Sequence, residues 1–190
     1  MAYLAPLGGF FCNSFVETKF NIMTAKKQLI AQYDLHNLLF NNVIADISDA
    51  ESNQSILAPM NNVKWLAGHL LWAQRNLVRI SGADVIIPWM EHFLQKNAST
   101  PEEINAPKGE FPTLEQIKQK WNEINLPIRT GLENLPEDAL NKVIISNHPI
   151  FPYDDTVAGL WAFINHHQAY TIGQIGILRR GMGKDAMKYD

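Results

Sequence analysis

The stretch TVAGLWAFINHHQAYTIGQIGILRR, residues 156–180, is apolar on almost every side of the helix that it predicts. Such a helix is typical of the interior of a helical bundle, where neighbouring helices cover all of its faces. Thr156 can cap its N-terminus, and Gly181 follows its last residue. We therefore expect an all-α fold with this helix buried near its centre.

Three segments upstream also have apolar residues at helical spacing. They cover residues 24–47, 63–80 and 113–134. Thr24 and Asn62 are suitable capping residues for the first two, and Thr113 with Gln116 makes a capping box for the third. Pro127 removes a backbone donor within the third segment, so we expect that helix to be kinked or divided.

The connection between the second and third helices decides the type of bundle. Residues 83–112 contain four prolines, and the pattern predicts only about one helical turn there, around residues 89–94. A link this long permits a crossover connection, unlike the short loops of an up-and-down bundle. The sequence thus predicts a four-helix bundle with a long crossover between helices 2 and 3. We expect one domain over residues 23–190, with residues 1–22 as an N-terminal extension.

Composition narrows the classes of function. The formal charge of −3 and the lack of a basic block argue against nucleic acid as a partner. The single cysteine, Cys12, cannot form an internal disulfide, which favours a reducing compartment such as the cytoplasm. No apolar run is long enough for a membrane anchor. Because only 18% of the residues are charged, we also expect broad helix faces to pair in a homodimer.

Histidines are the residues with the clearest chemical potential. Helical spacing sends His36, His69 and His167 inward, whereas His166 points about 100° away from its neighbour. A lone inward histidine is most often a core residue, but two on facing helices can bind a metal such as zinc, nickel or iron. We therefore select His69 and His167 as candidate ligands, with His36 as a possible third group. His92 and His148 lie in loops where exposure is expected, and we assign them no role.

The sequence resembles the DinB/YfiT-like superfamily of small bacterial four-helix proteins over residues 24–183. The resemblance rests on NVKWLAGHLLWAQRNL and, far downstream, FINHHQAYTIGQIGILRRGMG. In that family the second helix has one histidine, matched by His69, and the last helix has two histidines four residues apart. His167 matches the first of these and Thr171 stands at the second. The family's Gly-Gln-Ile-x-x-Leu-Arg run is matched by Gly173, Gln174, Ile175, Leu178 and Arg179.

Two hypotheses of function follow. Family members with all three histidines bind a divalent metal, so the resemblance implies a metal-dependent hydrolase or thiol transferase. A threonine hydroxyl is a poorer ligand than imidazole, and Thr171 therefore predicts a degenerate site with weak metal binding. The alternative is a metal-free protein that binds a small molecule or a partner and has lost catalysis.

Overall fold

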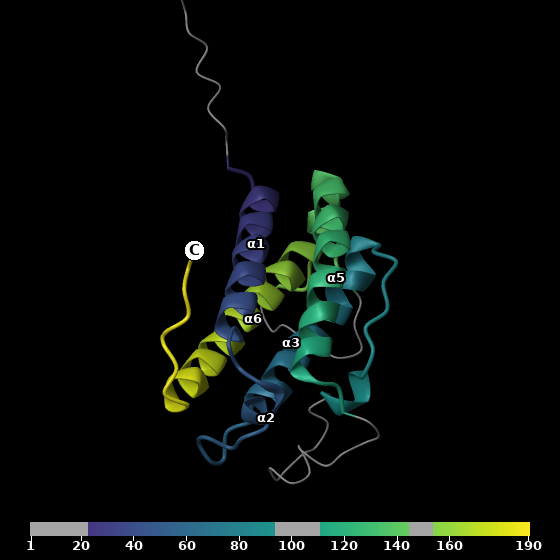
Figure 1. Ribbon diagram of the computed structural model, residues 1–190. Coiled ribbons are helices and arrows are strands. Elements are labelled where there is room, and N and C mark those ends of the chain that lie inside the picture. The colour runs from purple at the N-terminus through teal and green to yellow at the C-terminus, as the bar shows by residue number, and fades with distance from the viewer. Residues whose placement is uncertain (1–22, 94–110, 145–153) are drawn as a thin grey trace, which may run out of the picture.

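The computed structural model describes residues 23–93, 111–144 and 154–190, so the proposed extension 1–22 and His148 lie outside the described residues. Four long helices form a bundle (Figure 1). They are α1 (Ala25–Val43), α3 (Val63–Ser81), α5 (Leu114–Asn134) and α6 (Val157–Gly181). The short helices are α2 (Asp49–Ser52), η1 (Met90–His92) and η2 (Glu137–Asn141). The predicted all-α class and the four main helices are confirmed.

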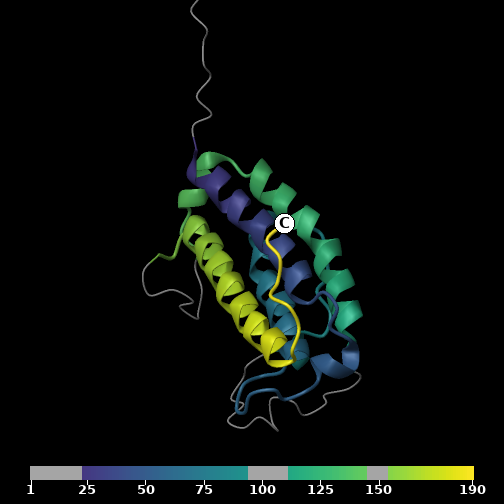
Figure 2. The ribbon, with the colours of Figure 1, turned by 60° about the vertical axis from the view of Figure 1, so that its left-hand side comes forward.

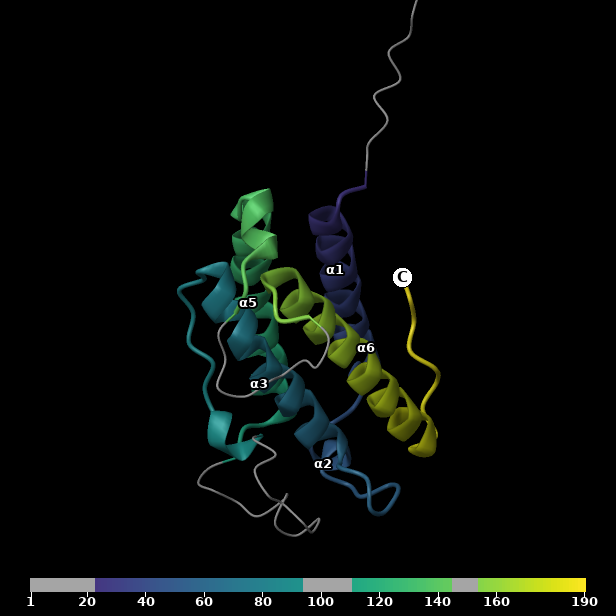
Figure 3. The same cartoon turned by 180° about the vertical axis from the view of Figure 1, so that it is seen from behind.

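The helices form a square in which α6 packs against α1 and α3, and α5 packs against the same two helices. Figure 2 shows α1 between α6 and α5, and Figure 3 shows the opposite side, with α3 and α6. α3 and α5 run parallel, because Asp49 contacts the start of both and their far ends meet at Ser81 and Gly131. Parallel neighbours need a long connection. The predicted crossover between them is therefore confirmed.

The helix starts depend on the capping residues that the sequence predicts. Each cap side chain accepts a hydrogen bond from a backbone N–H in the first turn, which satisfies a donor that has no partner within the helix. The caps are Thr24, Asn62, Thr113 and Thr156. Local sequence thus fixes where the long helices begin.

Three local features differ from the prediction. The first helix ends at Val43 and not at residue 47, and Asp46 beyond it has a positive φ of 62°. The polar stretch that follows contains α2, which begins with a capping box between Ser48 and Glu51. Of the two outcomes expected at Pro127, a kink or a division, the division is wrong, since α5 continues through the proline. Buried Ile124 and Ile128 on either side hold the helix against the bundle although one backbone hydrogen bond is absent.

The largest fully buried side chains of the core are aromatic. Trp121 stacks on Phe40 at 4.2 Å between ring centroids, and Tyr33 meets Trp161 edge to face at 5.5 Å. Within the part of the chain that the structure describes, no helix is long and apolar enough to cross a membrane. The homodimer expected from composition stays a prediction.

Candidate functional site

His69 of α3 and His167 of α6 lie against each other inside the bundle. Their ring centroids are 5.1 Å apart and the rings meet edge to face at 75°. His69 is buried and His167 is half-buried. The approach of these two rings is what their helical positions predict, whereas their role as ligands stays a prediction.

The His69 ring is fixed on three sides. It stacks between Trp65, at 4.8 Å, and Trp72, at 5.1 Å, which lie one turn before and after it on α3. Its Nδ1 atom lies 3.1 Å from the backbone oxygen of Phe93. A carbonyl can only accept, so Nδ1 carries the proton and donates it in this hydrogen bond. In the neutral ring, Nε2 is then left with its lone pair.

The His167 ring is held less completely. It stacks on Phe163, one turn earlier on α6, with 6.0 Å between centroids. Its Nε2 atom is buried and has no hydrogen-bond partner among the described residues. Most buried polar atoms have a partner, so this nitrogen is a candidate for contact with a ligand.

Burial keeps both rings neutral at pH 7. It lowers the pKa of His69, and the hydrogen bond to the Phe93 carbonyl opposes this shift only in part. Burial, followed by repulsion from His69 and His166, lowers the pKa of His167 to about 4. Neutral imidazole is the form that coordinates a metal ion or accepts a proton.

Thr171 and His36 do not make a third imidazole position. Thr171 is buried one turn after His167, as its spacing predicts. His36 of α1 is also buried, but it faces Asn165 and Gln168 of α6. Among the described residues, no group of three or more His, Cys, Asp or Glu side chains is arranged to hold a metal ion.

One neighbour of His69 has a part in the site that sequence patterns did not predict. Phe93 supplies the carbonyl, and its ring packs directly on Gly68 of α3. His92 was expected to be exposed but is buried, because its ring packs against Phe93 and Phe111. Gly68, a glycine inside a helix and directly before the candidate ligand His69, was the one sequence signal that could have indicated a close contact there.

Two further residues of α6, Arg179 and His166, lie outside the histidine pair. Arg179 is buried and donates hydrogen bonds to the backbone oxygens of Asp185 and Ala45, so it joins the C-terminal segment to the loop after α1. His166 is exposed, as expected from its angle on the helix.

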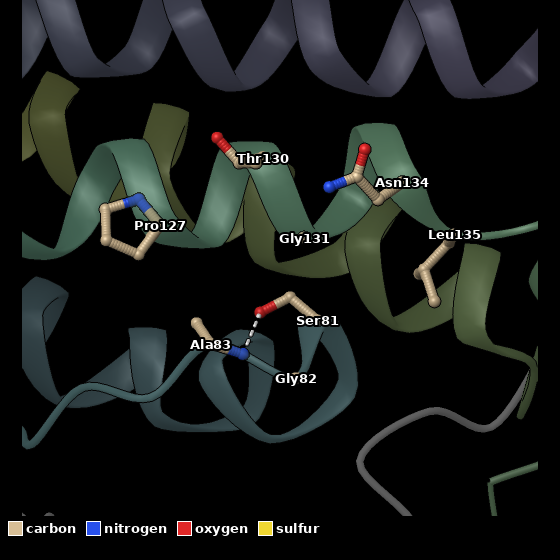
Figure 4. Close-up of a pocket in the computed structure, with 8 residues that line it drawn as sticks. All are labelled: Ser81, Gly82, Ala83, Pro127, Thr130, Gly131, Asn134 and Leu135. Carbon is tan, nitrogen blue, oxygen red and sulfur yellow. Dashed lines mark hydrogen bonds between the residues drawn. The ribbon is translucent and has the colours of Figure 1, made fainter.

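A groove of about 320 Å³ lies elsewhere, between the end of α3 and the second half of α5. Figure 4 shows the side chains of Thr130 and Asn134 pointing away from α3, and the Ser81 hydroxyl accepts from the Ala83 N–H. The histidine pair does not line this groove.

The spacing of the two histidine rings is compatible with two positions of a divalent metal site. Two imidazoles bound at about 2.0 Å to one tetrahedral ion place their ring centres about 5 Å apart, which agrees with the observed 5.1 Å. The unpartnered Nε2 of His167 and the oriented ring of His69 also suit a ligand role. The third position does not fit, because Thr171 offers only a hydroxyl. The donor set suits a weakly held ion.

Comparison with known proteins agrees with this fold. The chain is similar to a solved structure described as the crystal structure of the conserved protein of locus from Enterococcus faecalis. The two share 19% sequence identity with a TM-score of 0.67, over 86% of this chain and 100% of the other. A search of curated proteins finds no match. The DinB superfamily profile matches residues 32–175, which is most of the chain. The helical bundle and this match together show that the chain belongs to the DinB superfamily.

Proposed function

We propose that His69 and His167 form a degenerate divalent metal site, in a protein of the metal-dependent hydrolase or thiol-transferase type. The observation that carries this proposal is the contact between two neutral imidazoles on facing helices, one of which has a buried nitrogen without a partner. Zinc, nickel or iron suits such nitrogen donors. With only two protein ligands, binding is weak and at least two coordination positions stay open.

Each residue has a separate part in this proposal. His69 presents Nε2 because the Phe93 carbonyl holds the proton on Nδ1. His167 presents the nitrogen that lacks a protein partner. Trp65 and Trp72 keep the His69 ring from rotating and exclude water from its faces. A divalent ion bound there would lower the pKa of a coordinated water or thiol, which supplies a nucleophile at neutral pH.

Metal titration tests the proposal. Untagged protein is first analysed for metal content, and calorimetry with zinc, nickel and ferrous ions is then performed on the wild type, His69→Ala and His167→Ala. We expect weak binding of one ion per chain, reduced at least about tenfold in either variant. His166→Ala is the matched control, because this exposed neighbour on the same helix should leave the affinity unchanged.

The alternative function is an outcome of the same experiment. If the purified protein contains no metal and none of the three ions binds, the proposal is wrong. The metal-free protein, which binds a small molecule or a partner through the same bundle, is then the better interpretation. Support for that alternative comes from Thr171, whose hydroxyl stands where a third imidazole is needed.

A further inference from the structure

We propose that Gly68 and Phe93 act as positioning residues that determine which nitrogen of His69 is free. Phe93 follows η1 within the connection from α3 to α5, and its ring is almost completely buried. The ring lies directly over Gly68. A Cβ atom at position 68 would stand 2.1 Å from both Cε1 and Cζ of Phe93, so only glycine permits this contact.

The same residue makes the hydrogen bond to His69. Because the Phe93 ring is seated at Gly68, its backbone oxygen lies 3.1 Å from Nδ1 of His69, the next residue of α3. The carbonyl accepts, which places the proton on Nδ1 and the lone pair on Nε2. Free histidine prefers the opposite tautomer, with the proton on Nε2. The packing of Phe93 on Gly68 therefore selects the less common tautomer of His69.

The rings of Phe111 and His92 hold the Phe93 ring in its position on Gly68. Phe111, which precedes α5, meets Phe93 edge to face at 5.3 Å, and its ring centroid lies 5.1 Å from that of His92. Two separate parts of the connection between α3 and α5 thus pack against each other around the ring that covers Gly68. This packing limits the movement of the Phe93 backbone, and so the direction of its carbonyl.

Glycine is an unfavourable choice for this position unless the contact matters. In a helix interior it costs about 1 kcal/mol relative to alanine. Gly173 on α6 is a useful contrast, since a Cβ there would meet nothing within 4 Å. An alanine should be tolerated at 173 and should displace Phe93 at 68. The two glycines form a matched pair of test and control.

The tautomer can be measured without metal. Nitrogen-15 chemical shifts of the histidine rings, recorded at pH 7.5 on metal-free protein, distinguish Nδ1–H from Nε2–H. We expect His69 to be in the Nδ1–H form in the wild type and in Gly173→Ala. Gly68→Ala should convert it to a mixture in which Nε2–H is prominent. Phe93→Leu, a milder change, should give a partial shift even if Gly68→Ala fails to fold.

The role of the freed nitrogen rests on the proposed metal site, but the tautomer does not. A folded Gly68→Ala protein whose His69 keeps the wild-type tautomer would overturn the inference, as would an Nε2–H form in the wild type. In zinc titrations, loss of the orienting hydrogen bond should weaken binding about 10-fold to 100-fold. If the tautomer shifts as expected and the wild type binds no zinc, the positioning inference holds and the proposed function fails.

Discussion

Two buried regions of the bundle contain inward histidines, and they differ in what surrounds the rings. The His69 ring lies between two indoles, donates to a backbone carbonyl and contacts a second histidine. His36 lies among amides instead, with Asn165 and Gln168 facing it and its Nδ1 atom unpartnered. Inward positions on these helices therefore give two different environments. His69 and His167 form a pair in which the His69 ring is oriented, whereas His36 lies in a polar layer whose hydrogen bonds are incomplete.

A fixed ring orientation distinguishes the candidate site from the polar layer of the core. Around His36, the buried amides also have unpartnered atoms, including Oδ1 of Asn165 and both polar atoms of Gln168. No backbone carbonyl or aromatic stack fixes the His36 ring in the contacts found among the described residues. Metal ligands usually have such an orienting partner. His69 has one, and this is why we place the site at the pair.

The largest expected effect is a gain of metal affinity in Thr171→His. The substitution places a second imidazole one turn after His167 and completes a three-nitrogen site with His69. We expect tighter zinc or nickel binding by about 100-fold, which equals about 2.7 kcal/mol. The gain stays below that of a fully supported ligand, because the new ring has no orienting partner.

Calorimetry on matched variants checks this prediction. Tyr170→His adds a histidine to the same helix at a side chain that is 65% exposed, and it should leave the affinity unchanged. If the wild type already binds as tightly as Thr171→His, another group completes the site. The degenerate-site hypothesis would then be wrong.

A smaller effect concerns stability in acid. An unfolded histidine titrates near pH 6.5, whereas the pKa of folded His167 is about 4, so below pH 6.5 protons bind preferentially to the unfolded chain. Folding stability should therefore be retained above pH 6.5 and fall as the pH drops toward 4. After allowance for the partial exposure of the ring, His167 should account for about 1.5 kcal/mol of the loss between pH 6.5 and 4.5.

Urea unfolding at the two pH values measures this loss. His167→Gln should lose less stability than the wild type on acidification. His36→Gln should also lose less, because burial lowers the pKa of His36, with Gln168 and Asn165 opposing the shift. An unchanged acid dependence in His167→Gln would show that the His167 ring is not held neutral by its surroundings.

These two regions also show how far the sequence could predict the site. Helical spacing placed His36, His69 and His167 inside because burial follows from a local repeat. Which rings meet depends on the order of the helices around the square, and this order depends on the crossover between α3 and α5. Phe93 lies in that irregular connection, where no repeat constrains a side chain. Its carbonyl could be assigned only from the structure.

A prediction of about 1 kcal/mol concerns the polar layer around His36. Gln168 is completely buried, and although its amide lies close enough to His36 to raise the pKa of that ring, neither of its polar atoms reaches hydrogen-bond geometry with any described residue. Gln168→Leu keeps a similar volume and removes the unpaired amide, so the free energy of unfolding should rise by about 1 kcal/mol. Thermal and urea unfolding would measure the change. Destabilisation by a similar amount would mean that the amide forms hydrogen bonds in solution, for example to ordered water.

The smallest expected effect is that of His36→Leu on metal affinity. His36 was the candidate third group, but its ring faces Asn165 and Gln168, and it does not form a metal-binding group of three with His69 and His167. We expect zinc affinity to stay within about twofold of the wild type, a change below about 0.4 kcal/mol. A drop as large as that in His167→Ala would identify His36 as a ligand, and the contrast between the two regions would then fail. Circular dichroism of the variant serves as the control, since a folded protein with unchanged affinity places His36 in the core and leaves the metal to the pair.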